Sequence, residues 1–138
     1  MRKAVILGLA FLLAAAAGAA LAGGQAAGTE TKPVTWDNWL AAKATAEKYD
    51  KEGKFVEALQ HYLEYIRLAQ ELGSPMHVAW GKNNAAFMII KRHKLDATVD
   101  LAPAKKLLDE GLAISQASEE CKALLATNLE YVNLFLKK

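Results

Sequence analysis

The stretch WLAAKATAEKYDKEGKFVEALQHYLEYIRLAQEL, residues 39–72, decides the fold. Apolar side chains recur in its second half at intervals of three and four residues, the period of one face of an α-helix: Phe55, Ala58, Leu59, Tyr62, Ile66 and Ala69. Gly53 and Gly73 each follow a helical segment, and glycine commonly ends helices because it adopts left-handed backbone without strain. The stretch therefore predicts two helices joined by a tight turn at Gly53.

The sequence on both sides of this stretch predicts further helices. Thr35 and Ser118 are candidate N-caps, and Ser74-Pro75 places a capping serine before a proline in the first turn. The expected helices cover residues 36–52, 55–72, 75–93, 101–115 and 118–137. No run of alternating Val, Ile and Thr competes with them, so the domain is expected to be all-α. Short links between five helices favour successive antiparallel α-hairpins.

Residues 39–72 resemble one unit of the tetratricopeptide repeat (TPR) family. That family's 34-residue hairpin carries small residues where its two helices approach and large residues beside them. With Gly53 at the tight turn, Ala46 and Ala58 fall on small positions, and Tyr49 and Tyr62 fall on large ones. The resemblance implies a stack of TPR-like helical hairpins that binds peptides or partner proteins in a groove lined by the first helix of each hairpin.

A second, stretched unit is expected over residues 75–117, followed by a C-terminal capping helix over 118–137. Its longer hairpin turn falls in KRHKLDATVD, residues 91–100, where a long loop is tolerated. Three of the departures from the family pattern are Tyr65 and Asn84, each at a position where a small residue is usual, and Gln70, where proline is usual. The bulk of Tyr65 puts the packing of the first hairpin on the next helix in question. An unrelated five-helix bundle is the alternative.

The N-terminal segment, residues 1–22, has the pattern of a signal peptide. Arg2 and Lys3 precede an apolar stretch, and Ala20-Leu21-Ala22 supplies a small-residue cleavage site. Cleavage before Gly23 leaves no membrane span, whereas an uncleaved leader serves as an anchor. Both alternatives place the domain outside the cytoplasmic membrane, so the chain is expected to be exported, in the periplasm or secreted, as is typical of short Ala-rich bacterial leaders.

The charge of the chain changes when the leader is set aside. Of the 17 basic residues, two lie in the leader, which leaves 15 against 15 acidic residues. A formal net charge of zero argues against a general nucleic-acid binder, which needs a basic excess. Residues 23–34, GGQAAGTETKPV, predict a flexible linker, because nothing there buries an apolar face. The helical domain is therefore expected over residues 35–138.

The residues that usually carry chemistry form no recognisable motif. No two of His61, His77 and His93 stand four residues apart. His61 and Glu64 share one helical face, but a di-iron bundle needs two such motifs and two more glutamates, and the sequence has no second motif. An exposed helix-surface histidine is the better interpretation of His61 than a metal ligand. Cys121 is expected to be buried on the last helix, with intermolecular cross-linking and nucleophilic catalysis as alternatives. No metal, no cofactor and no catalytic residue are predicted.

The resemblance implies which residues face the groove. On the first unit they are Leu40, Lys43, Glu47 and Asp50, and on the second they are Gly81, Ala85, Met88 and Ile89. The paired Asn83-Asn84 has two interpretations. Either one amide faces solvent while the other bonds a neighbouring backbone group, or one projects into the groove and fixes a peptide backbone. The predicted partner-binding residues are Lys43, Glu47, Asp50, Asn84 and Met88.

Three functions remain open from the sequence. The leading hypothesis is an exported, non-catalytic protein–protein interaction scaffold that binds a peptide or partner protein in this groove. The second is a self-assembling homo-oligomeric module of the cell envelope, with an apolar interface around Trp36, Trp39 and Tyr65. The third is a small-ligand carrier or enzyme with a pocket near His61, Tyr62 and Tyr65.

Overall fold

The computed structural model of the chain describes residues 31–137. The expected signal peptide, residues 1–22, and most of the expected linker, residues 23–34, lie outside the described residues. Residues 31–35 have no regular secondary structure.

Five α-helices make up the described part of the chain, and no strand occurs between residues 31 and 137. In chain order they are α2 (Trp36–Lys51), α3 (Phe55–Glu71), α4 (Pro75–Leu95), α5 (Ala102–Leu112) and α6 (Glu119–Leu136). The all-α expectation is confirmed for these residues. None of the described helices is both long enough and apolar enough to cross a membrane.

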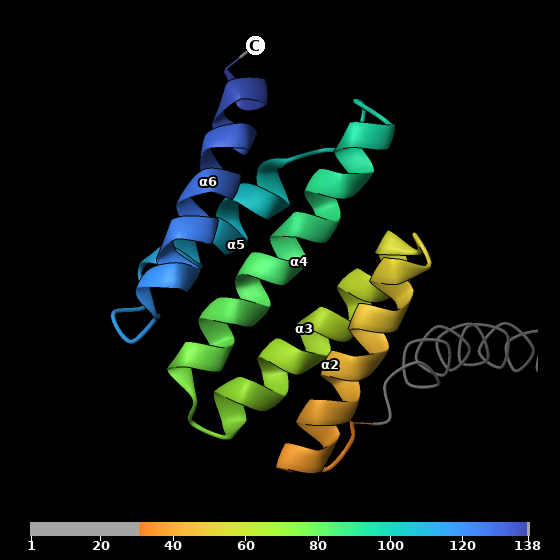
Figure 1. The fold of residues 1–138 in the computed structure, drawn as a ribbon, viewed down its shortest axis with the longest axis vertical. Coiled ribbons are helices and arrows are strands. Elements are labelled where there is room, and N and C mark those ends of the chain that lie inside the picture. Colours follow the sequence, from red (N-terminus) through yellow and green to blue (C-terminus); the bar gives the residue numbers. More distant parts are fainter. Residues whose placement is uncertain (1–30, 138) are drawn as a thin grey trace, which may run out of the picture. The chain divides into compact units, whose positions relative to one another are not determined.

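The helices pack in chain order (Figure 1). α3 lies between α2 and α4, and α5 and α6 follow on the other side of α4. Each helix runs opposite to the one before it, because short links turn the chain back on itself. α2 packs chiefly on α3, whereas α6 packs on α5 and α4. α2 therefore lies at one end of the domain, and α5 and α6 lie at the other.

The predicted helix ends at the two glycines are confirmed. Gly53 has φ +74° and Gly73 has φ +71°, both in the left-handed region. The amide N–H of Lys54 donates to the carbonyl of Tyr49 at 2.9 Å, and that of Ser74 donates to the carbonyl of Ala69 at 2.9 Å. These bonds satisfy carbonyl groups at the ends of α2 and α3 that the helices leave unpaired.

Two of the three predicted N-caps are formed. The Thr35 hydroxyl accepts from the backbone N–H of Asn38 at 3.1 Å, and the Ser118 hydroxyl accepts from that of Cys121 at 3.1 Å. Ser74 differs, because its hydroxyl makes no capping bond and instead forms a hydrogen bond with Nδ1 of His77 at 2.6 Å. The helix after Ser74 begins at Pro75 as expected.

Two helix ends differ from the predicted positions by more than one residue. α4 continues beyond His93 to Leu95, and the N–H of Asp96 still donates to the carbonyl of Arg92 at 2.9 Å. α5 ends at Leu112 rather than Ser115. Beyond it, Ile114 donates to the carbonyl of Gly111 at 3.1 Å, a bond of the tighter 3₁₀ type that often closes a helix.

The buried side chains form two hydrophobic clusters, and α4 belongs to both. The first, the α2–α3 cluster, includes Val78, Ala85 and Met88 of α4. The second, the α5–α6 cluster, includes four residues of α4: Ala79, Ala86, Ile89 and Ile90. α4 thus buries opposite faces, which is characteristic of a helix surrounded by neighbours. On α6, Leu124 and Phe135 are apolar residues that stay 43% and 40% exposed.

Two glycines allow close helix contacts. A Cβ added to Gly81 of α4 would lie 2.6 Å from Cγ1 of Ile66 and 2.6 Å from Cδ1 of Tyr65 on α3. A Cβ added to Gly111 of α5 would lie 2.8 Å from Cδ2 of Leu125 on α6. The bulk of Tyr65 is therefore accommodated, because the residue that faces it on the next helix has no side chain.

Candidate functional site

Lys43 and Glu47 are the most accessible of the predicted partner-binding residues. They stand one helical turn apart on α2, and Lys43 Nζ lies 2.7 Å from Glu47 Oε1. Their side chains are 39% and 43% exposed. An ion pair at this spacing holds both charged groups in place on the helix surface while leaving each partly open to solvent.

Asp50 joins α2 to α4. Its carboxylate Oδ1 accepts from Lys91 Nζ at 2.6 Å, and the two side chains are 22% and 26% exposed. The Lys91 ammonium also lies 4.7 Å from the ring centre of Phe87 and 5.4 Å from that of Phe55. Such cation–π contacts fix the ammonium in addition to the ion pair. Asp50 therefore links two helices that are not neighbours in the chain.

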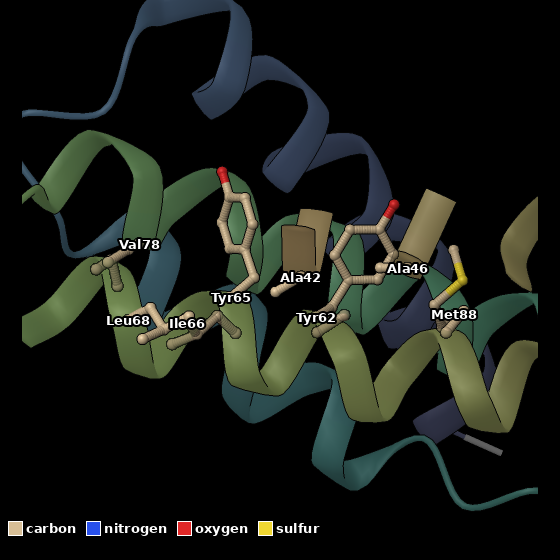
Figure 2. Close-up of a cluster of buried hydrophobic side chains, with 11 residues drawn as sticks. Ala42, Ala46, Tyr62, Tyr65, Ile66, Leu68, Val78 and Met88 are labelled. Carbon is tan, nitrogen blue, oxygen red and sulfur yellow. The ribbon is translucent and has the colours of Figure 1, made fainter. Parts of the chain in front are cut away.

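Tyr62 and Tyr65 of α3 point away from their own helix and lie beside Ala42 and Ala46 of α2 (Figure 2). They are 4% and 3% exposed. The small alanines make room for the two rings, as the spacing of the sequence predicted for Ala46 and Tyr62. Five partly exposed residues of α2 and α4 are together called the α2/α4 face, of which Asp50 and Lys91 are joined by their ion pair: Lys43, Glu47, Asp50, Asn84 and Lys91.

The environment of the two tyrosines opposes their ionisation. Burial raises the pKa of Tyr62 to about 12, and the negative charges of Asp50 and Glu47 add to the effect. Burial likewise raises the pKa of Tyr65. Both phenols are therefore neutral near pH 7, able to donate or accept a hydrogen bond but not to act as a base.

The prediction that Met88 binds a partner is wrong. Its side chain is 1% exposed and belongs to the α2–α3 cluster, so it does not reach a partner in this structure. Gly81, Ala85 and Ile89, also expected to line the groove, are buried as well. The reason is that α4 contacts α3, α5 and α6, which cover the side chains that a two-hairpin stack was expected to leave open.

Neither interpretation of Asn83-Asn84 describes the structure fully. Asn83 is 5% exposed, and its Oδ1 accepts from Nδ2 of Asn128 on α6 at 2.9 Å. Its own Nδ2 donates to Oδ1 of Asn84 at 3.3 Å. Asn83 thus connects α4 to α6 through a side chain rather than a backbone group. Asn84 stays partly exposed on the α2/α4 face.

His61 and Cys121 take no part in a reactive cluster of the described residues. The His61 ring is partly buried and stacks on Tyr49, with ring centres 5.4 Å apart and planes 18° apart, so it is less exposed than expected. Cys121 is buried, as predicted, and burial raises the pKa of its thiol. Between residues 31 and 137, no three or more His, Cys, Asp or Glu side chains are grouped to hold a metal ion.

An aromatic cluster at the start of α2 and α4 was only partly predicted. The Trp39 ring lies 5.5 Å from Trp36, 4.9 Å from Tyr65 and 4.6 Å from His77, measured between ring centres. The indole N–H of Trp39 is buried without a hydrogen-bond partner. His77 was not assigned to this cluster from the sequence; the signal was its place three residues after Ser74, one helical turn from the hydroxyl that bonds it.

A shallow, open hollow of about 320 Å³ lies beside the turn between α3 and α4. It is lined by Gln70, Gly73, Ser74, Pro75, Val78 and Ile114. None of His61, Tyr62 and Tyr65, the residues expected around a small-ligand pocket, lines this hollow.

The chain matches no protein-family model, no curated protein and no solved structure.

Proposed function

We propose that the chain is an exported, non-catalytic interaction protein that binds a peptide or a partner protein through the α2/α4 face. The observation that carries this proposal is the Lys43–Glu47 pair, two opposite charges 2.7 Å apart and both about two-fifths exposed. A partner that carries a carboxylate next to a basic group can form an ion pair with each of these two residues. Below the pair, Tyr62 and Tyr65 of α3 pack beside Ala42 and Ala46 of α2.

We also propose that α2 with α3 and α4 with α5 are TPR-like hairpins, closed by α6. Ala46 and Ala58, on the small positions of the first unit, are both fully buried where α2 meets α3. Gly111, on a small position of the second unit, touches Leu125 of α6. In such an arrangement the first helices of the two hairpins, α2 and α4, present the binding surface.

Selection of peptides from a random display library on the purified protein tests the binding proposal. We expect enriched peptides that carry neighbouring acidic and basic residues. Replacing both Lys43 and Glu47 with alanine should weaken their binding by roughly tenfold, because the accessible charges of the face are removed. The matched control is Lys105→Ala with Asp109→Ala, a pair of the same spacing and similar exposure on α5, which should leave binding unchanged.

The peptide experiment has two outcomes that contradict the proposal. Equal binding by the Lys43/Glu47 variant and the wild type rejects the α2/α4 face as the site. Failure to enrich any peptide above a blank surface rejects peptide binding itself. Circular dichroism of both variants checks that the helices remain folded, which is expected because both pairs lie on partly exposed surfaces.

The proposed export rests on the leader, residues 1–22. Expression in a bacterial host followed by fractionation and N-terminal mass measurement tests it. We expect the domain outside the cytoplasm with a new N-terminus at Gly23. A domain found in the same fraction with Met1 or Arg2 still present identifies the anchored alternative, and a cytoplasmic domain rejects export.

A further inference from the structure

The outer face of α2 is not covered by any other described helix. Leu40 is 56% exposed, Ala41 and Ala44 are exposed, and the side chain of Lys48 is 71% exposed. Lys51, also exposed, follows one turn later. Intervals of three and four residues place them on one stripe of the helix. The stripe is apolar and small in its middle and carries Lys48 and Lys51 at its C-terminal end, where Lys48 Nζ lies 4.0 Å from Glu52 Oε1.

The outer face of α6 has the complementary character. Its N-terminal end is acidic, with Glu119 91% exposed in its side chain and Glu120 also exposed. Leu124 and Thr127 follow on the same stripe, and Leu124 is 43% exposed. The last helix of a helical stack normally has a polar outer face, which keeps the stack soluble. Leu124 is therefore an apolar side chain exposed in the middle of this face.

One register matches the two stripes along their length. When α2 lies antiparallel to α6 with Lys48 beside Glu120, the helical period brings Ala44 beside Leu124 and Ala41 beside Thr127. Opposite charges meet at one end, and a small side chain faces a larger one in the middle. Antiparallel helices also place the positive N-terminal end of α6 beside the negative C-terminal end of α2.

The polar groups in the middle of the stripes are already satisfied. The hydroxyl of Thr127 donates to the carbonyl of Ala123 at 2.9 Å, and that of Thr45, beside the α2 stripe, donates to the carbonyl of Ala41 at 2.8 Å. Each threonine can therefore turn its methyl group outward. No unpaired hydroxyl opposes contact between the two helices.

We propose that copies of this chain associate head to tail, with the outer face of α2 of one copy on the outer face of α6 of the next. The match of charge and of side-chain size between the two faces identifies a second copy as the occupant. Because the two faces differ, each added copy leaves one of each open, and the assembly grows as an open chain instead of closing as a symmetric dimer. The α2/α4 face stays available in every copy.

Charge reversal on the full chain tests this proposal by sedimentation velocity at up to roughly millimolar concentration, because a single helix pair is a small interface. We expect the wild type to show a series of species whose average mass rises with concentration. Lys48→Glu with Lys51→Glu, and separately Glu119→Lys with Glu120→Lys, should each weaken association by roughly tenfold or more. Lys106→Glu, an 80% exposed control on α5, should leave it unchanged.

Mixing the two reversed variants provides the decisive measurement. Each variant alone carries like charges on both faces, but the mixture offers an acidic α2 to a basic α6 and a basic α2 to an acidic α6. Association should therefore return in the mixture. Leu124→Ser should reduce association without charge change, and circular dichroism checks that it stays folded.

Three results overturn the proposal. The first is a chain that stays monomeric at the highest concentration. The second is a closed dimer that does not grow further. The third is association that persists in both reversed variants, which assigns the contact to residues 1–30 or to another surface of the domain.

Discussion

Tyr65 shows how one side chain decides a helix contact. A large residue at this position departs from the repeat pattern, and the sequence alone placed the packing of the next helix in question. In the structure Gly81 of α4 faces Tyr65, and because glycine has no side chain, the ring has room. From its repeat position Gly81 was expected to face the groove. That position does not reveal that Gly81 lies against Tyr65, which depends on how α3 and α4 pack.

Gly81→Ala should lower the free energy of unfolding by about 1–3 kcal/mol, because the new methyl group overlaps Ile66 and the rigid ring of Tyr65. Chemical denaturation measures the change. Gly111→Ala is the matched comparison, since its methyl group meets the end of the Leu125 side chain, which can rotate away, and alanine favours helix by about 1 kcal/mol. Equal losses in the two variants contradict the steric argument.

Tyr62 should make stability fall in alkaline solution. Its pKa is raised from 10.0 to about 12 in the folded chain, so the folded state keeps the phenol proton more tightly than the unfolded state does. The stabilisation is present below pH 10 and is lost as the pH rises towards 12, by about 2–3 kcal/mol. Denaturation series from pH 9 to pH 12 measure it.

Tyr62→Phe supplies the control for the alkaline series. Phenylalanine keeps the ring but cannot ionise, so this variant should lose less stability between pH 10 and pH 12 than the wild type. The remaining slope is expected from Tyr65, whose pKa burial also raises. Parallel curves for the variant and the wild type show that the Tyr62 phenol does not titrate as proposed.

At the scale of the helices, the sequence predicts beginnings and turns better than contacts. Thr35, Gly53, Gly73 and Ser118 mark helix ends correctly, because caps and left-handed glycines depend on a few neighbouring residues. The burial of Met88 could not be predicted in the same way. It depends on how many helices surround α4, which is a property of the packed domain.

The Asn83–Asn128 bond between α4 and α6 has the same origin. The two residues are 45 positions apart, and only the packed helices bring their amides together. Asn128→Ala should lower the free energy of unfolding by about 1–3 kcal/mol, because the buried oxygen of Asn83 loses its donor. Thermal and chemical denaturation measure the loss.

A double variant separates the bond from simple packing. Asn83 and Asn128 are each replaced with leucine, singly and together. The double variant lacks both polar groups, so its loss of unfolding free energy should be smaller than the sum of the losses of the two single leucine variants. Strict additivity of the two single losses indicates that the amides do not act on each other.

The domain as a whole is organised around α4, which belongs to both hydrophobic clusters. α2 has one main neighbour and carries an exposed outer stripe. Hydrogen exchange followed by mass spectrometry at low protein concentration should therefore show slower exchange in α4 than in α2, because α4 opens only when both clusters separate. Equal protection of the two helices contradicts this order.

The unpaired indole N–H of Trp39 has a spectroscopic consequence. An indole shielded from water and without a hydrogen-bond acceptor emits fluorescence at shorter wavelength than a solvated one, and Trp36, 47% exposed, supplies the solvated counterpart in the same cluster. Because Trp39 also touches His77 and Tyr65, its emission reports on the joint of α2, α3 and α4 at once. Trp39 is thus an optical probe near the start of α2.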